Sequence, residues 1–346
     1  MSVAHDSPTS DHALLRVCNA SKQFAPSLSF GDHIAVWLGQ EIDQRIVHAV
    51  DGVSLTLHRG EVLGLVGESG CGKSTLGRMM AGIYPASQGN IRLDGVPVMG
   101  AGKKPLKTTT RIQMVFQDPF ASLDPRVRVG ETIGEGPLFH GLVNAADLKA
   151  YVTHWLETVG LPAEAADRFP HQFSGGQRQR VAIARALAMQ PDVLICDEPV
   201  ASLDVSIQAQ IINLFLKLKH ELKLTMLFIS HDLGVIRHIT DNIAIMYLGR
   251  IVERGPTLDV YENPKHPYTR ALLDSIPRLV TEGDELVVFK AIDGELPSPL
   301  APPPGCHFHL RCPHAQEICK TRVPDFEDQP SPPVSGHDVA CHFPLG

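Results

Sequence analysis

The residues whose types and spacing most clearly indicate a binding chemistry lie between positions 67 and 75. Here the spacing G-x-x-x-x-G-K-[ST] follows a short apolar run, and in this pattern glycines let successive backbone N–H groups point at phosphate oxygens. We expect Lys73 to meet the β- and γ-phosphates of a nucleoside triphosphate and the Ser74 hydroxyl to hold Mg²⁺. A glycine-rich turn with a stray lysine is the alternative, which the preceding strand disfavours. The expected triphosphate-binding residues are Gly67, Glu68, Ser69, Gly70, Cys71, Gly72, Lys73, Ser74 and Thr75, with Cys71 as a small residue rather than a nucleophile.

Two consecutive carboxylates end the apolar run 193–196. At the end of a strand, Asp197 fits a ligand, direct or through water, to the Mg²⁺ held by Ser74. Glu198 points differently and could polarise the attacking water as a general base. Because Pro199 follows, the pair could equally cap a helix, and taken alone the two interpretations have equal weight. The phosphate loop upstream favours catalysis.

Two further polar residues follow predicted strands. His231 comes after the apolar residues 227–229 and is placed to touch the γ-phosphate, although a lone histidine is more often structural. Gln117 follows residues 114–116 at the border of a helical segment. There its amide could contact the γ-phosphate and Mg²⁺ and report to a partner docked on that segment, although glutamine in a turn is common. We include both residues among the catalytic candidates.

These candidates require a sheet whose strands end at the same edge. The short apolar runs at 61–66, 193–196 and 226–229 are typical of buried parallel strands, so we expect an α/β fold. The sequence also predicts a strand over 14–24, two strands over 53–66 with a turn at 57–60, and a hairpin over 243–253 that turns at Gly249. Helices are expected over 148–156, inside a helical part spanning about 120–175, and over 177–189.

The composition limits the classes of function. The chain has 346 residues, a net charge of -7, 43% hydrophobic residues and a mean hydropathy of -0.01. These values are typical of a soluble globular protein without a basic surface for nucleic acid. No run approaches the roughly 18 apolar residues of a membrane span, and the N-terminal residues lack the pattern of a secretory signal. The seven cysteines, an odd number, suit a reducing cytosol better than a disulfide framework.

Residues 173–180, Phe-Ser-Gly-Gly-Gln-Arg-Gln-Arg, resemble the signature of ATP-binding-cassette (ABC) ATPases, and the likeness extends over about residues 14–260. It implies a P-loop NTPase cassette: a RecA-like core with an antiparallel β subdomain and a helical subdomain. In this family two cassettes sandwich ATP, so that the signature of one subunit meets the γ-phosphate held by the other. The resemblance assigns Ser174, Gly175, Gly176 and Gln177 to that contact, Asp204 to the same interface, and Phe24 to stacking on adenine.

Three further segments are similar to the second ATPase of oligopeptide, dipeptide and nickel importers, namely residues 117–126, 266–273 and 294–300. This resemblance implies a peripheral subunit on the cytoplasmic face of an inner membrane, paired with a paralogous ATPase or with itself. Two transmembrane permease subunits and an extracytoplasmic substrate-binding protein would complete the importer. Di- or oligopeptides are then the expected cargo, with nickel or another small solute as the alternative.

Two other classes of function fit the motifs less well. A soluble ABC ATPase acting on DNA or ribosomes would carry a long coiled-coil insertion or a second cassette, and the sequence has neither. A nucleotide sensor without turnover would have lost the base at Glu198, which is present. The sequence therefore favours a transport ATPase that uses ATP and Mg²⁺ and does not bind nucleic acid.

The residues after 296 contain eleven of the 27 prolines and four of the seven cysteines. A segment so poor in core residues needs an additional cross-link to stay folded, and a metal centre can supply one. Four thiolates suit a [4Fe–4S] cluster or structural Zn²⁺. The spacing resembles the iron–sulfur tail of some peptide importers, which favours the cluster, while four reduced and buried cysteines are the alternative. We expect a disordered region 1–12, an ATPase domain 13–260 and a separate, loop-rich extension 261–346. The expected metal ligands are Cys306, Cys312, Cys319 and Cys341, and one of the nearby histidines could replace a thiolate, namely His307, His309, His314 or His342.

Overall fold

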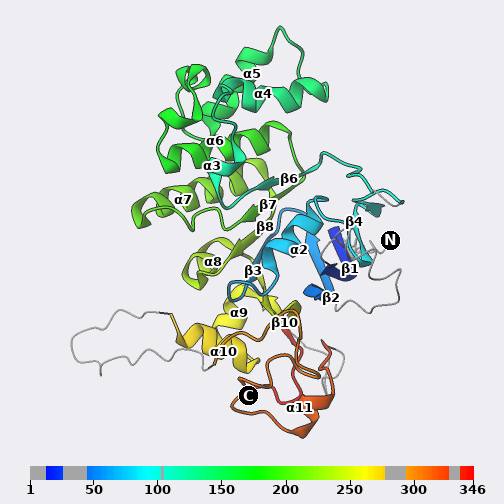
Figure 1. Cartoon of the computed structure of the whole chain (residues 1–346). Coiled ribbons are helices and arrows are strands. Elements are labelled where there is room, and N and C mark those ends of the chain that lie inside the picture. The colour runs from blue at the N-terminus through cyan, green and yellow to red at the C-terminus, as the bar shows by residue number, and fades with distance from the viewer. Residues whose placement is uncertain (1–12, 26–44, 103–104, 277–293, 327–335) are drawn as a thin grey trace, which may run out of the picture.

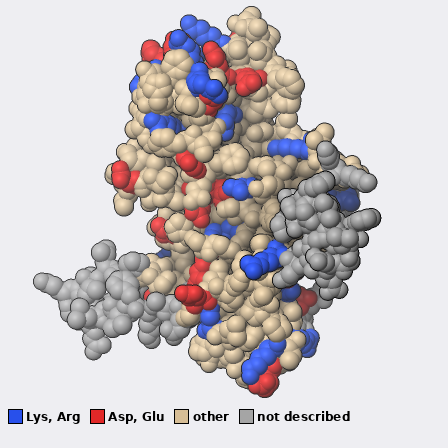
Figure 2. Space-filling view, in the orientation of Figure 1, with Lys and Arg blue, Asp and Glu red and all other residues tan. Residues whose placement is uncertain are grey.

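The computed structural model describes residues 13–25, 45–102, 105–276, 294–326 and 336–346. The predicted disordered N-terminus, and all but the ends of the segment between Ala25 and Ile46, lie outside the described residues. Two sheets and a helical region make up the fold (Figure 1). On the face drawn in Figure 2, basic and acidic side chains are interspersed over a largely uncharged surface.

The larger sheet has seven strands in the order β11-β10-β9-β3-β8-β7-β6. The five consecutive strands from β9 to β6 in this order run parallel. Every residue of β3, β7 and β8 is buried, as expected for parallel strands covered on both faces. The register pairs Val66 with Ser230 and Asp197 with Ile229, so these three strands end at one edge of the sheet. The parallel strands are β3 (Val62–Val66), β6 (Ile112–Val115), β7 (Val193–Asp197), β8 (Thr225–Ser230) and β9 (Asn242–Tyr247), and β10 (Arg250–Pro256) and β11 (Asp338–Val339) are antiparallel.

The smaller sheet is antiparallel, with the order β2-β1-β4-β5. Its strands are β1 (Ala13–Phe24), β2 (Val47–His58), β4 (Gln88–Leu93) and β5 (Val96–Pro97). The expected turn near residue 60 is present, but β2 and β3 enter different sheets and do not pair with each other. Helix α2 (Lys73–Met80) joins the two sheets, because its buried Leu76 and Met79 share one core with Leu57 of β2 and Leu65 of β3.

The helical region extends from one side of the larger sheet (Figure 1). Buried residues of α4, α5 and α6, such as Ile133, Trp155 and Val181, share a second core that continues into the larger sheet. Along the part of the chain that is described, no helix is both long and apolar enough to cross a membrane. The helices are α3 (Pro119–Ser122), α4 (Val129–Phe139), α5 (Leu148–Thr158), the 3₁₀ turns η1 (Ala163–Asp167) and η2 (Pro170–Gln172), α6 (Gly175–Ala188), α7 (Val205–Leu222), α8 (Leu233–Ile239), α9 (Thr257–Glu262), α10 (Pro267–Asp274) and α11 (Glu317–Thr321).

The C-terminal tail is loop-rich, as predicted, but it does not pack as a separate unit. Its strand β11 pairs with β10 at the edge of the larger sheet, where Arg254 Nε donates to Asp338 Oδ2 at 3.0 Å. Next to it the fully buried Glu253 accepts the backbone N–H groups of Lys265 and His266, and its Oε1 lies 2.7 Å from Nε2 of His337. The tail therefore completes a sheet that begins in the predicted ATPase domain (Figure 1).

Candidate active site

The phosphate loop connects β3 to α2, the strand–loop–helix context that the motif requires. Lys73 is 4% exposed, and its ammonium group donates to the carbonyl oxygens of Gly67 at 2.7 Å and Glu68 at 2.9 Å. Gly72 has a φ of 109°, and a Cβ there would lie 2.1 Å from the carbonyl oxygen of Ala49 in β2. The loop is thus curled around its lysine and pressed against the smaller sheet, which leaves room only for glycine at that position.

Cys71 is buried inside the loop, and its burial raises the pKa of the thiol although the nearby Lys73 charge opposes this. A thiol that stays protonated is a poor nucleophile. This agrees with the interpretation of Cys71 as a small packing residue.

Ser74 lies in the first turn of α2 and meets the end of β7. Its hydroxyl donates to Asp197 Oδ1 at 2.7 Å. Asp197 is 1% exposed, and its burial raises the pKa of the carboxyl group while the Ser74 hydrogen bond lowers it. A hydroxyl and a carboxylate at this separation supply two oxygen ligands of the kind that Mg²⁺ prefers. Sequence reasoning predicted this pair across 123 residues.

Glu198, directly after β7, brings the remaining two candidates together. Gln117 Nε2 donates to Glu198 Oε2 at 3.1 Å, and Nδ1 of His231 lies 3.2 Å from the same oxygen. The Glu198 side chain is 11% exposed, whereas the His231 side chain is 51% exposed. Because both contacts are made to Oε2, among the described residues Oε1 is left free to accept a proton from water. The pair of carboxylates does not cap a helix, since residues 198–204 form turns before α7.

The signature residues sit elsewhere on the chain. Ser174 caps α6 in a reciprocal capping box, in which the Gln177 N–H donates to Ser174 Oγ and the Ser174 N–H donates to Gln177 Oε1. A Cβ on Gly176 would lie 2.5 Å from Ile207 Cγ2 of α7, so the two helices touch at this glycine. Across the described ranges, no hydrogen bond joins residues 174–177 to residues 67–75. The structure therefore does not bring the signature to the phosphate loop of its own chain.

The two other predicted nucleotide contacts lie at element ends. Asp204 occupies the N-cap position of α7 without a side-chain cap bond. Phe24 ends β1 and contacts Tyr84 edge to face at a centroid distance of 5.5 Å. Phe24 also pairs with Val47, two residues before the Ala49 carbonyl that touches Gly72. This places the phenylalanine on the sheet against which the phosphate loop packs.

Sequence reasoning missed two residues of the tail that contact the phosphate loop. Arg311 donates to both carboxylate oxygens of Glu68, at 2.8 Å and 3.1 Å. The Tyr268 hydroxyl accepts the backbone N–H of Glu68 at 2.9 Å. Burial raises the pKa of the Tyr268 hydroxyl, so this group stays protonated. Tyr268 lies in a segment that the sequence singled out by resemblance, but no pattern linked either residue to the loop.

The four tail cysteines line one small cavity together with the buried His266. Burial raises the pKa of the Cys306 thiol to about 11 and that of Cys341 to about 12, with smaller contributions from the neighbouring thiols. In the described part of the chain, however, no group of three or more His, Cys, Asp or Glu residues is arranged to hold a metal ion. The predicted zinc or iron–sulfur centre therefore has no support from this geometry.

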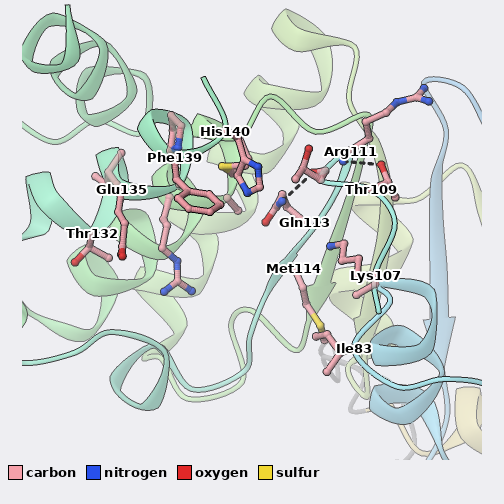
Figure 3. Close-up of a pocket in the computed structure, with 18 of the residues that line it drawn as sticks. Ile83, Lys107, Thr109, Arg111, Gln113, Met114, Thr132, Glu135, Phe139 and His140 are labelled. Carbon is pink, nitrogen blue, oxygen red and sulfur yellow. Dashed lines mark hydrogen bonds between the residues drawn. The ribbon is translucent and has the colours of Figure 1, made fainter. Parts of the chain in front are cut away.

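A groove of about 1150 Å³ opens between the sheet and the helical region (Figure 3). One wall carries Thr132, Glu135 and Phe139 of α4, and the facing wall carries Gln113 and Met114 of β6. Phe139 is 82% exposed despite its size. Phe116, which directly precedes the candidate Gln117, also lines the groove. The groove therefore reaches the residue directly before Gln117, whose amide contacts Glu198.

A phosphate loop after β3, a hydroxyl–carboxylate pair at β7 and a strand-end glutamate define a P-loop ATPase of the cassette class. Residues 50–201 match the family described as ABC transporter, and residues 252–319 match the oligopeptide/dipeptide transporter C-terminal region. The oligopeptide transport ATP-binding protein AppF of Bacillus subtilis is 50% identical over 302 residues, which cover 86% of this chain and 90% of the relative. The dipeptide transport ATP-binding protein DppF of Escherichia coli is 45% identical over 310 residues, covering 89% and 91%.

Solved structures agree with this assignment. CbiO1 from Clostridium perfringens, part of an ABC transporter complex, aligns with a TM-score of 0.58 and 28% identity over 73% of this chain and 92% of that chain. A dimeric ATP-binding cassette bound to ADP and phosphate aligns with a TM-score of 0.58 and 25% identity, covering 70% and 99%. The chain belongs to the ATP-binding proteins of the ABC transporter family and is an ATPase.

Proposed function

We propose that this ATPase powers the uptake of di- or oligopeptides across an inner membrane, from a peripheral position on the cytoplasmic face. The observation that carries the proposal is the C-terminal region of the oligopeptide/dipeptide type, joined in one chain to a complete set of phosphate-loop and strand-end residues. The names of the relatives point to the same cargo, since they describe oligopeptide and dipeptide transport.

Uptake into vesicles tests the cargo directly. The full-length chain, its ATPase partner, the permease subunits and the binding protein are reconstituted, and ATP-dependent accumulation of a labelled dipeptide, a labelled pentapeptide and Ni²⁺ is measured. We expect accumulation of peptide that stops when ATP is replaced by ADP. Accumulation of Ni²⁺ without peptide would replace the proposed cargo, and accumulation of none of the three would contradict it.

The roles of the site residues follow from their contacts. Lys73 would bind the β- and γ-phosphates, and the backbone of residues 67–75 would surround them. Ser74 and Asp197 would hold Mg²⁺, which when bound neutralises charge on the phosphates. Glu198 would accept the proton of the attacking water at Oε1, while Gln117 and His231 orient the carboxylate through Oε2.

We propose that the active unit is a pair of cassettes, formed with a paralogous ATPase or with a second copy. The capping box at Ser174 leaves the first N–H groups of α6, at Gly175 and Gly176, directed away from the helix. Such groups favour an anion, and the phosphate loop of the same chain does not meet them. The γ-phosphate of ATP bound to the partner cassette would accept hydrogen bonds from these N–H groups. Asp204 would lie at the interface between the two cassettes, and Phe24 would stack on adenine.

We also propose that the groove in Figure 3 receives a short helical segment of a permease subunit. The support is the exposed Phe139 on one wall and the presence of Phe116 among the lining residues, because movement at Phe116 would displace the following Gln117, whose amide contacts Glu198. Docking and hydrolysis would then be linked through two adjacent residues. The helical part, about 120–175, would act as the permease-facing part of the 13–260 ATPase domain.

Finally, we propose that the cysteine cavity takes up a [4Fe–4S] cluster rather than a single zinc ion. The cavity is lined by the four thiols and by His266, whose Nε2 is buried and has no hydrogen-bond partner among the described residues. Anaerobic purification followed by iron, sulfide and zinc analysis tests this, and a colourless protein without stoichiometric iron would contradict it.

A further inference from the structure

Glu68 is the point at which the phosphate loop and the C-terminal tail meet. Its three polar groups are all engaged. The carbonyl oxygen accepts from Lys73 at 2.9 Å, the backbone N–H donates to Tyr268 at 2.9 Å, and the carboxylate receives two bonds from Arg311. The contacts of Tyr268 and Arg311 come from beyond the 13–260 ATPase domain. Those from within the loop are made by Lys73 and by the Cys71 N–H, which donates to the same carbonyl oxygen at 3.3 Å.

The contact with Arg311 is a strong one by its geometry. The guanidinium group donates through both Nη atoms to the two carboxylate oxygens, the paired arrangement that gives charge-assisted bonds direction as well as strength. The side chains are 6% and 23% exposed, so water screens the pair less than it would on the surface. Removing one partner would leave the other charge partly buried and unpaired.

The tail segment that carries Arg311 is itself anchored. Phe308 is 2% exposed and packs against Tyr247 and Tyr268 at centroid distances of 5.2 Å and 5.4 Å. The two tyrosines contact each other at 4.7 Å. Nδ1 of His307 lies 2.9 Å from the carbonyl oxygen of Leu248, directly after β9. Arg311 therefore projects from a fixed segment, so its position can determine that of Glu68.

We propose that Arg311 and Tyr268 are positioning residues of the nucleotide site, which hold Glu68 and through its carbonyl group set the place of the Lys73 ammonium. The inference rests on the proposed role of Lys73 in binding the triphosphate. A loop held in its binding conformation binds ATP more tightly, because the apparent dissociation constant rises as the competent fraction falls. The tail then forms part of the ATP site and is more than an attachment to the cassette.

Titration of the full-length chain with ATP and Mg²⁺ tests this. We expect Arg311→Gln to raise the Kd for ATP about tenfold, corresponding to a competent fraction of about one tenth. In the assembled transporter the KM for ATP should rise by a similar factor, while kcat stays within about twofold, because Arg311 does not touch the reacting atoms. Arg311→Lys should restore part of the affinity, since lysine keeps the positive charge but cannot donate to both carboxylate oxygens in the paired geometry of a guanidinium group.

Arg254→Gln is the matched control. Arg254 forms another guanidinium–carboxylate pair between tail and sheet, with Asp338, and does not contact the phosphate loop. The Arg254→Gln substitution should lower the melting temperature of the protein without changing its Kd for ATP. In a double-mutant cycle, Glu68→Gln combined with Arg311→Gln should weaken binding no further than either change alone, because the two side chains act as one pair.

Two results would overturn the inference. One is a Kd in Arg311→Gln within about twofold of the wild-type value, and the other is an equal loss of affinity in Arg254→Gln, which would indicate general damage to the tail. Lys73→Ala separates the inference from the proposed function beneath it. If that variant loses ATP binding while Arg311→Gln does not, only the positioning role fails; if neither loses binding, the nucleotide site itself is wrong.

Discussion

Glu198 adopts a φ of 46°, in the left-handed region that residues other than glycine seldom occupy. Such backbone strain is found where the surrounding structure fixes a functional side chain. Here the backbone N–H of Glu198 donates to Ile229 of β8, and the carboxylate meets Gln117 and His231. At the scale of single residues, the strand end thus directs the Asp197 carboxylate to Ser74 and the Glu198 carboxylate to Gln117 and His231, and under the proposed function these two carboxylates would meet Mg²⁺ and the attacking water.

Replacing this base should separate binding from turnover. Glu198→Gln keeps the size of the side chain but cannot accept a proton, so we expect hydrolysis to slow by about two to four orders of magnitude while ATP binding remains. Steady-state phosphate release and equilibrium ATP titration measure the two effects. Glu221→Gln, an exposed change on α7, should alter neither. Near-normal turnover in Glu198→Gln would remove that residue from its role.

Lys73 should act on binding itself. A hydrogen bond to a charged group contributes about 1.5–3 kcal/mol, so Lys73→Ala should weaken ATP binding by about ten- to a hundredfold. Calorimetric titration measures the affinity, and a melting curve shows whether the loop still folds without the two bonds to Gly67 and Glu68. Lys217→Ala, on the surface of α7, is the control. An unchanged affinity in Lys73→Ala would contradict the assignment of the phosphate loop.

At the scale of elements, the sequence predicted the parallel strands well. Uninterrupted apolar runs such as 193–196 indicate strands buried on both faces, and polar residues at their ends share one edge because parallel strands end together. The same reasoning could not separate β2 from β3. A turn at Arg59-Gly60 has the same local signal whether the next strand pairs back or crosses to another sheet, and that choice depends on distant partners such as Met226.

The contact between α6 and α7 gives a prediction at this scale. A methyl group at Gly176 would lie 2.5 Å from the Cγ2 methyl group of Ile207, too close without a shift of one helix. We expect Gly176→Ala to destabilise the fold by about 1–3 kcal/mol, the usual cost of overpacking. Gly175→Ala is the control. Its Cβ would lie 3.3 Å from the end of the Leu203 side chain, which can move aside without a shift of the helix. Equal unfolding free energies for the two variants in denaturant titrations would contradict the steric argument.

At the scale of the whole molecule, the tail was the least predictable part. The four cysteines do share a cavity, which their spacing suggested, but the paired contact of Arg311 with Glu68 joins residues 243 positions apart. No periodicity or local pattern carries that information, because an arginine in a loop-rich segment looks the same with or without a partner. The position of β11 at the edge of the larger sheet is unpredictable for the same reason.

The groove between sheet and helical region yields the prediction at this scale. Phe139→Asp places a charge on the exposed wall residue, so we expect the amount of permease that co-purifies with the chain to fall about tenfold, as for loss of an aromatic anchor. Leu258→Asp, at another exposed apolar position on α9, should leave that amount unchanged. The melting temperature of each variant, measured alongside, shows whether the fold is intact. Undiminished co-purification of Phe139→Asp would place the permease elsewhere.

The ion pair between Glu68 and Arg311 also has a consequence for biosynthesis. A ribosome makes the phosphate loop early, yet the arginine that grips it is residue 311 of 346. While the chain is still being translated, the loop lacks this contact, and it can gain the contact only after residue 311 has been added, 243 residues after Glu68. A chain that ends before residue 311 would therefore lack the ion pair at Glu68, although the contacts of Tyr268 and Lys73 with that residue could still form.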